Sequence, residues 1–534
     1  MSTPAQIPQD ADADVIIVGS GFGGSVAALR LTEKGYRVIV VEKGRRWTPE
    51  TLPATNWNLR RSFWLPWVSC YGTWGLHILR EALILHGVGV GGGSLLYAST
   101  HFEPPATVWQ DPMWRELEDW ASVMPEHYAT ANRMLGSARN PSLGPADEAL
   151  RTAAAKRGRE HTFRPTDVGI FFGESGVEVD DPYFGGEGPR RTGCTFCGAC
   201  MVGCTPGAKN TLDKNYLYLA EKRGARIVPE TRVDLIEPLP DGGYRLHWTR
   251  STRRVAPQRG TLTAGRVVVS AGVLGTVALL MKSRERGALP HLSDRLGDVV
   301  RTNSEALLGI TSSSRRDLCE GIAITSKMEM DDVTHVEPVR FSKGSDVMLL
   351  LGTLLTDGGG RMPRQLRWVG NVLRHPIRFL RVTNPIGKAE RSNVLLVMQT
   401  VDNHTRLVRQ RQWLWPFNRA LTSRPAPDQP GIPSYIPIAN EVARDFAAEL
   451  DAIPQSTLNE VLLDTSTTAH ILGGCAMAPT PELGVVDGDG QVFGHPGLYV
   501  MDGSLIGANL GVNPSLTITA LAEYVTSRFP PRGE

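Results

Sequence analysis

The feature that most limits the possible folds is a glycine pattern near the start of the chain. Residues 15–18 form an apolar run, which predicts a strand that is buried on both faces. Gly19, Gly21 and Gly24 follow it with G-x-G-x-x-G spacing. In this spacing the glycines allow a tight turn, close approach of a pyrophosphate and close packing of the next helix. The pattern therefore predicts a strand, a phosphate-binding turn and a helix in succession.

The residues after these glycines complete a dinucleotide-binding unit. A helix is expected over 25–33 and a second buried strand over 37–41. The helix N-terminus would offer free N–H groups to a phosphate, and Glu42, which ends the second strand, would accept hydrogen bonds from ribose hydroxyls. We therefore expect a Rossmann-like α/β domain that binds a dinucleotide. A tight turn without a ligand is the alternative.

A second glycine-dense segment, HGVGVGGGSLLY, occupies residues 86–97. Its glycines would expose backbone N–H groups and let a flat or charged ligand come close. Apolar residues bound the segment on both sides, so we interpret it as a second cofactor-contacting element rather than a flexible linker. Its candidate contact residues are Gly89, Gly92, Gly93 and Ser94.

Composition limits the class of protein. The chain has 534 residues, of which 41% are hydrophobic, and a net charge of +2. This length suggests two or more domains or one composite domain, and the low net charge offers no field that would recruit nucleic acid. The first twelve residues carry no secretion-signal pattern, and no 18-residue apolar run predicts a transmembrane helix. We expect a cytoplasmic protein.

Four of the seven cysteines are clustered, at Cys194, Cys197, Cys200 and Cys204. The spacing C-x2-C-x2-C-x3-C nearly reproduces the bacterial ferredoxin run, and without a second run it would hold a four-iron or a three-iron cluster. Zinc or structural thiols are one alternative, and two local disulfides are another. The clustering also favours a reducing compartment over a dispersed disulfide framework.

Residues 306–460 have a different pattern. Short apolar runs such as 347–355 and 393–400 suggest an antiparallel sheet. Between them, residues 361–382 form a basic amphipathic helix that Pro376 should split after His375. Its apolar stripe comprises Met362, Leu366, Val369, Leu373, Ile377 and Leu380, and its arginines lie off that stripe. Such a helix can lie on an anionic membrane; packing on its own domain is the favoured alternative.

The C-terminal region supplies the candidate catalytic residues. His470 is followed by Gly473 and Gly474, which would leave space for a ligand, and Asn513 precedes a helix expected over 515–527. A strand expected over 497–501 leads into Asp502 and Gly503. A lone histidine is more often structural, but here the glycines and the downstream asparagine favour a functional role.

Together these segments resemble the glucose–methanol–choline (GMC) flavoprotein oxidoreductases, most closely the cholesterol-oxidase-like branch. The matching segments are VGSGFGGSVAALRL, HGVGVGGGSLLY, GAKNTLDKNYL, VSAGVLGT, AHILGGC and DGSLIGANLGVNPSLTITALAE, in family order along the chain. The resemblance implies FAD as the cofactor and an α+β substrate domain built on an antiparallel sheet. It implies a discontinuous FAD domain (1–105, 205–305 and 465–534), a substrate domain (106–192 and 306–464) and a cysteine loop at 193–206.

The resemblance also implies residue roles. His470 and Asn513 take the two active-site positions beside the flavin and the substrate hydroxyl. Glu42 takes the ribose role and Val233 lies on the adenine side, while Asp502 and Gly503 count among the cofactor-binding residues. The cysteine run departs from ordinary cholesterol oxidases and is similar to the iron–sulfur loop of bacterial FAD glucose and gluconate dehydrogenases. No carboxylate base can be placed within 306–460.

The expected activity is oxidation of an apolar alcohol, such as a sterol, a terpenoid or a long-chain alcohol, to its carbonyl. FAD would accept the hydride. An iron–sulfur cluster would then pass electrons to an external acceptor, a protein or a quinone. One alternative is an oxygen-using alcohol oxidase with structural cysteines, and another is a non-catalytic electron-transfer flavoprotein. Residues 361–382 would allow peripheral contact with the inner face of the membrane.

Overall fold

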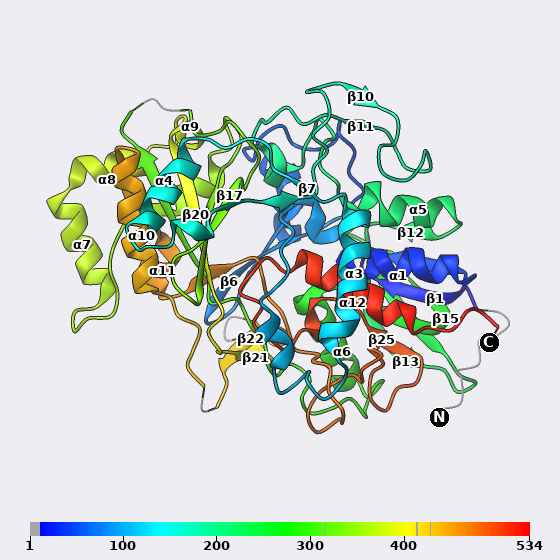
Figure 1. Cartoon of the computed structure of the whole chain (residues 1–534). Coiled ribbons are helices and arrows are strands. Elements are labelled where there is room, and N and C mark those ends of the chain that lie inside the picture. The colour runs from blue at the N-terminus through cyan, green and yellow to red at the C-terminus, as the bar shows by residue number, and fades with distance from the viewer. Residues whose placement is uncertain (1–10, 315–316, 413–414, 428, 534) are drawn as a thin grey trace.

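The computed structural model describes residues 11–314, 317–412, 415–427 and 429–533. Two seven-stranded sheets and one five-stranded sheet organise the fold. Figure 1 shows the first large sheet at the right, and the second at the left with the helices α7, α8 and α10. The expected combination of an FAD-binding α/β fold with a second, antiparallel sheet is confirmed.

The first large sheet is parallel at its centre and antiparallel at one edge. Its order is β12-β2-β1-β15-β14-β13, and β25 pairs in parallel with the C-terminal end of β15. β1 and β2 are buried throughout, as is usual in the parallel part of a sheet, and α1 packs against both strands. The strands are β1 (Ala13–Val18), β2 (Val38–Val41), β12 (Arg226–Val228), β13 (Thr231–Pro238), β14 (Tyr244–Arg250), β15 (Arg259–Val269) and β25 (Leu498–Val500).

Helices from distant parts of the chain pack together on this sheet. α1, near the N-terminus, lies against α12 at the C-terminus, as the blue and red ribbons of Figure 1 show. Arg30 of α1 joins Glu523 of α12 with an N–O distance of 2.7 Å. The helices are α1 (Phe22–Glu33), α3 (Trp120–Leu135), α5 (Tyr216–Lys222), α6 (Gly272–Glu285) and α12 (Ser515–Ser527). The expected bounds of α12 are confirmed.

The second large sheet has the order β19-β23-β16-β20-β18-β17-β8, and its neighbouring strands are antiparallel. Helices α10 and α4 pack on one face with a separate apolar core. The strands are β8 (Arg164–Pro165), β16 (Ala306–Ser312), β17 (Ser326–Glu329), β18 (Thr334–Val339), β19 (Gly352–Leu354), β20 (Ser392–Gln399) and β23 (Ala452–Thr457). The helices are α4 (Pro145–Ala155), α7 (Arg364–Arg374), α8 (Pro376–Thr383), α9 (Lys388–Arg391), α10 (Pro437–Glu449) and α11 (Leu458–Leu463).

The five-stranded sheet has the order β24-β6-β5-β3-β4. Its strands are β3 (Phe63–Leu65), β4 (Cys70–Tyr71), β5 (Trp74–Ile78), β6 (Ala82–Gly87) and β24 (Ser466–Thr468). Helix α2 (Leu59–Ser62) precedes it, and a separate hairpin joins β21 (Thr405–Gln412) to β22 (Trp415–Pro425). The remaining short strand pairs are β7 (Ala138–Arg139) with β9 (Asp167–Val168), and β10 (Glu178–Val179) with β11 (Arg191–Thr192).

Two local predictions need adjustment. A strand is expected over 347–355, but only β19 (Gly352–Leu354) is a strand there. The residues before it, Val347–Leu351, form a 3₁₀ helix. The helix expected over 361–382 is split at the predicted place: α7 ends at Arg374 and α8 begins at Pro376. None of the described helices is long and apolar enough to cross a membrane. The domain boundaries given above stay a prediction.

Candidate active site

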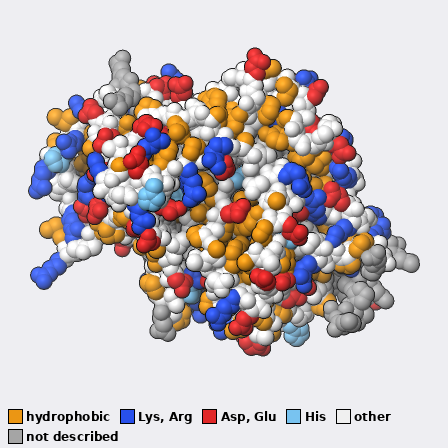
Figure 2. Space-filling view, in the orientation of Figure 1, with side chains coloured by type: hydrophobic (Ala, Val, Ile, Leu, Met, Phe, Trp, Pro, Cys, Tyr) orange, Lys and Arg blue, Asp and Glu red, His pale blue; other side chains and the backbone are white. Residues whose placement is uncertain are grey.

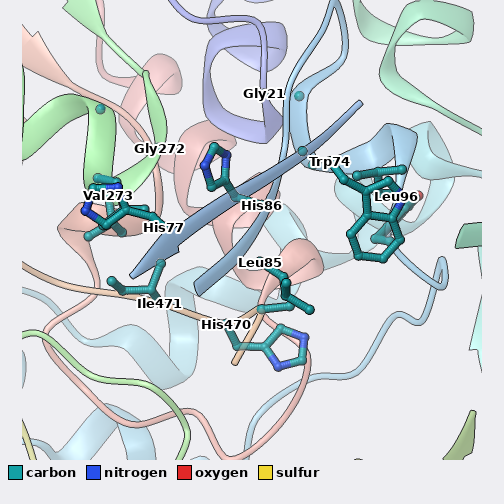
Figure 3. A pocket seen from close by; sticks show the side chains of 18 of the residues that line it. Gly21, Trp74, His77, Leu85, His86, Leu96, Gly272, Val273, His470 and Ile471 are labelled. Atoms are coloured by element: carbon teal, nitrogen blue, oxygen red, sulfur yellow. The ribbon is translucent and has the colours of Figure 1, made fainter. Parts of the chain in front are cut away.

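One large cavity, of about 1080 Å³, runs from the carboxyl ends of β1 and β2 to the second sheet. Figure 3 shows side chains that enter it from β5, β6 and the segment after β24. Of the predicted site residues, the following line it: Gly19, Gly21, Glu42, Gly92, Gly93, Val233, His470, Asp502, Gly503 and Asn513. Gly24, Gly89 and Ser94 lie behind this wall, and the cysteines line a different, much smaller cavity.

The first glycine loop has the geometry of a phosphate site. Gly19 has a φ of +101°, and a Cβ there would lie 2.2 Å from the Ser270 carbonyl oxygen. A Cβ on Gly24 would lie 2.2 Å from the Gly19 carbonyl oxygen, whereas one on Gly21 would meet no protein atom within 4 Å. Packing therefore requires glycine at positions 19 and 24. At Gly21, the space that a side chain would fill is part of the cavity, at the N-terminus of α1. These residues fit a bound pyrophosphate.

Glu42 holds the glycine loop to the end of β2. Its side chain is buried, and its Oε2 accepts hydrogen bonds from Ser20 N at 3.1 Å and Ser20 Oγ at 2.8 Å. Its Oε1 accepts one from Gly44 N at 2.7 Å. A carboxylate has about four acceptor positions, so one is left for a ligand in the cavity. The predicted bidentate contact with a ribose stays a prediction.

The second glycine segment lies directly against the first. A Cβ on Gly92 would come within 2.7 Å of the Gly21 Cα, so the two loops form adjacent parts of one wall. Ser94 Oγ donates to the Gly91 carbonyl oxygen at 2.7 Å and accepts from Leu212 N at 3.0 Å. Ser94 therefore shapes this segment from behind rather than facing the cavity.

Asp502 and the start of α6 form the next part of the wall. Asp502 is buried and accepts hydrogen bonds from Thr276 Oγ1 at 2.5 Å and Ser504 N at 2.8 Å. Burial raises the pKa of Asp502 despite these donors. The carboxyl group thus fixes the loop between β25 and α12, on which Asn513 lies.

His470 follows β24 and is held by a buried carboxylate. Its Nδ1 contacts Glu305 Oε1, and Glu305 Oε2 accepts a hydrogen bond from Ala469 N at 3.2 Å. Because Nδ1 is engaged, Nε2 is the ring nitrogen left for a ligand. Burial alone would lower the pKa of His470, but the Glu305 carboxylate outweighs burial and, with a contribution from Glu337, raises the pKa above 6.5.

Asn513 presents a polar group to the same cavity. Its Nδ2 donates to Glu337 Oε2 at 3.4 Å, and its buried Oδ1 has no hydrogen-bond partner among the described residues. Glu337 is completely buried, and its Oε1 lies 2.9 Å from His335 Nε2. Asn513 therefore has a fixed amide with hydrogen-bonding capacity left for a ligand oxygen.

The sequence did not identify Glu305 and Glu337. Glu337 lies within 306–460, where no carboxylate could be placed, and it faces inward from β18, a strand whose six residues are all buried. A charged residue inside a buried strand is a usable signal, because such a charge needs a partner. Glu305 immediately precedes β16 and carries no comparable local pattern.

The four clustered cysteines line a separate cavity of about 10 Å³. Cys194 Sγ accepts a hydrogen bond from Phe196 N, and Cys204 Sγ accepts one from Lys209 N, each at 3.4 Å. Burial raises the pKa of Cys194 to about 11 and that of Cys200 to about 12, so both are neutral thiols at neutral pH.

Neither a metal centre nor a disulfide is found at these cysteines. All of them are free thiols. Within the described part of the chain, no group of three or more His, Cys, Asp or Glu side chains is placed to hold a metal ion. The disulfide alternative is wrong, the predicted iron–sulfur centre gains no support, and structural thiols fit the geometry.

Comparison with known proteins agrees with this site. Family models described as GMC oxidoreductase match residues 189–298 and 396–522, and one described as FAD binding domain matches residues 14–51. A cholesterol oxidase of Acinetobacter baumannii is 45% identical, over 97% of this chain and 94% of that protein. This chain belongs to the GMC oxidoreductase family. It is an FAD-dependent enzyme that acts on CH–OH donors.

Other relatives of this GMC oxidoreductase extend the comparison. A cholesterol oxidase of Mycobacterium tuberculosis (strain ATCC 25618 / H37Rv) is 46% identical, over 98% of this chain and 92% of that protein. A long-chain-alcohol oxidase of Arabidopsis thaliana is 24% identical, over 97% of this chain and 67% of that protein. The crystal structure of pyridoxine 4-oxidase from Mesorbium loti has the same fold, with a TM-score of 0.65, 17% identity and coverage of 97% and 99% of the two chains.

Proposed function

We propose that this enzyme oxidises the hydroxyl group of a sterol, or of a similarly apolar alcohol, to the carbonyl and reduces molecular oxygen to peroxide. The observation that carries this proposal is a single cavity with the glycine loops at one end, His470 and Asn513 in the wall and apolar side chains beyond them. These apolar side chains include Leu85, Leu307, Val339, Phe341 and Met348. Relatives named cholesterol oxidase and long-chain-alcohol oxidase support the substrate class.

His470 and Asn513 have separate tasks in this reaction. FAD, when bound, supplies the hydride acceptor. The neutral imidazole of His470 takes the hydroxyl proton at Nε2, while Glu305 holds Nδ1 and stabilises the positive charge that results. Asn513 binds the substrate oxygen through an amide that Glu337 orients. The apolar wall excludes water and aligns the carbon that loses its hydrogen.

Anaerobic and aerobic turnover of the purified holoenzyme test this function. Under anaerobic conditions we expect cholesterol to bleach the flavin absorbance, and a long-chain alcohol to do so more slowly. In air we expect one peroxide for each alcohol oxidised, without an artificial acceptor. If none of the apolar alcohols bleaches the flavin, the proposed substrate class is wrong, and the enzyme acts on a different CH–OH donor.

The sequence spacing of the four cysteines motivates a second candidate, in which electrons leave through an iron–sulfur cluster to a protein or quinone. All four cysteines line one cavity, and two of their sulfurs accept backbone N–H bonds, as cluster thiolates commonly do. Iron and acid-labile sulfide analysis of protein purified without air distinguishes the candidates. We expect no stoichiometric iron; bound iron and sulfide together with less than one peroxide per alcohol would favour the second candidate.

A further inference from the structure

Helices α7 and α8 form a pair at the far edge of the second sheet, remote from the glycine loops (Figure 1). The pair is anchored on β19. Val372, Phe379 and Val382 pack against Leu354 and Ile453. Polar contacts add to this: Trp368 Nε1 donates to Thr353 Oγ1 at 2.8 Å and Asn371 Nδ2 donates to the Leu355 carbonyl oxygen at 3.0 Å. The inner face of the helix pair therefore packs against the second sheet.

The predicted apolar stripe is on the opposite, outer face. Its members are exposed to 55% at Met362, 59% at Leu366, 44% at Val369, 76% at Leu373, 66% at Ile377 and 67% at Leu380. The two helices therefore do pack on their own domain, as the favoured alternative expects, but through their inner face, and the stripe itself is left exposed. Ile386, just after α8, is also exposed, to 80%. Isolated exposed apolar residues are common, but a continuous row on two helices marks an interaction surface.

The charges beside this row have one sign. Arg361, Arg374, Arg378 and Arg381 are exposed, and none forms an ion pair with any described residue. No Asp or Glu occurs from residue 358 to residue 389. Figure 2 shows blue and orange side chains together at this edge of the molecule.

We propose that the outer face of α7 and α8 docks on an anionic lipid bilayer. A basic amphipathic helix binds such a surface by placing its apolar side chains at the headgroup boundary while its arginines meet lipid phosphates. The four arginines, and the lack of any Asp or Glu in residues 358–389, supply the charge complementarity. A protein interface would instead be expected to centre on aromatic anchors, and the exposed row is aliphatic.

The docking surface is one strand away from the large cavity. Gly352 of β19 lines the cavity, whereas its neighbours Thr353 and Leu354 contact the helix pair. An enzyme docked by this face would have its substrate cavity close to the lipid from which an apolar alcohol comes. The docking itself does not depend on which alcohol is oxidised. The cytoplasmic location expected from the sequence stays a prediction.

Vesicle flotation of the holoenzyme tests the proposal. We expect the protein to float with vesicles of phosphatidylcholine containing phosphatidylglycerol, to float poorly with phosphatidylcholine alone, and to be released by high salt. The apolar variant is Leu373→Gln/Ile377→Gln and the charge variant is Arg374→Gln/Arg378→Gln. We expect each to bind at least about tenfold more weakly, because both the apolar contacts and the charges contribute.

Matched controls change the same side-chain types far from this face. Val255→Gln removes an apolar side chain that is 88% exposed, and Arg253→Gln/Arg259→Gln removes two exposed charges, one in the loop after β14 and one at the first residue of β15. These controls should float like the wild type. All variants should turn over a detergent-dispersed alcohol at the wild-type rate, which separates docking from catalysis.

Two results overturn the proposal. One is the absence of wild-type binding to anionic vesicles. The other is an apolar variant that floats as well as the wild type. A concentration-dependent dimer in light scattering that Leu373→Gln/Ile377→Gln abolishes, without any vesicle binding, would assign the face to a second copy of the chain instead.

Discussion

Glu305 contacts His470 at the junction between the second large sheet and the five-stranded sheet. Glu305 precedes β16 and His470 follows β24, and the carboxylate meets both the Nδ1 of His470 and the backbone N–H of Ala469. The side chain and the backbone of this segment are therefore fixed by one buried acid. The contact selects the ring nitrogen that faces the cavity and determines when the ring is charged.

His470→Gln tests the role of the ring. Glutamine keeps hydrogen-bonding capacity but cannot act as a base, so we expect kcat to fall by about 10²–10⁴. FAD content and melting temperature should be unchanged. His291→Gln, at an exposed histidine outside the cavity wall, is the control. Turnover at the wild-type rate in His470→Gln would remove His470 from the mechanism.

Glu305→Gln tests the positioning contact through the pH profile. His470 must be neutral to accept a proton, and its pKa is raised above 6.5, so wild-type kcat/KM should rise with pH through that raised value. Without Glu305, burial dominates and lowers the pKa. The rising part of the kcat/KM profile should then move below pH 6.5. The value of kcat should also fall, because Glu305 no longer fixes which ring nitrogen of His470 carries the proton.

Glu337→Gln serves as the comparison for that shift. Glu337 contributes less than Glu305 to the raised pKa of His470. Its loss should therefore move the rising part of the kcat/KM profile to lower pH, but by a smaller amount. If kcat/KM of Glu305→Gln is lower at every pH but still rises at the wild-type pH, the role of Glu305 is only structural.

Local patterns were sufficient for the elements that hold the cofactor site. The glycine spacing at Gly19, Gly21 and Gly24 predicts β1 and α1, and Pro376 predicts the break between α7 and α8, because both act through steric rules within a few residues. The Glu305–His470 contact spans 165 residues and depends on how two sheets meet. Likewise, the period of the α7–α8 stripe shows that a face is apolar but not whether it is covered.

The cysteines offer a prediction about electron flow. Cys200 is buried, and substitution by alanine removes one sulfur from a tightly packed loop, so Cys200→Ala should lower the free energy of unfolding by about 1 kcal/mol. If the thiols are structural, the ratio of peroxide to alcohol should stay at one. Cys70→Ala, at a buried cysteine outside this cluster, is the control. A Cys200 variant that loses visible absorbance beyond the flavin bands would contradict a structural role.

Gly21 and Gly24 give opposite predictions for the same substitution. A Cβ at Gly21 meets no protein atom within 4 Å, and its φ of −72° suits alanine, so Gly21→Ala should change the stability of the FAD-free protein by less than about 0.5 kcal/mol. The new methyl group occupies the space left for the pyrophosphate. FAD affinity should therefore fall at least about tenfold, equivalent to about 1.4 kcal/mol.

At Gly24 the new methyl group would clash with the Gly19 carbonyl oxygen, so Gly24→Ala should destabilise the FAD-free protein by about 1–3 kcal/mol. Chemical unfolding of both apoproteins and flavin fluorescence titration measure the two effects separately. Gly370→Ala, on an open and exposed part of α7, should leave FAD affinity unchanged. Wild-type FAD affinity in Gly21→Ala would contradict the placement of the pyrophosphate at this loop, because the methyl group has no other neighbour to disturb.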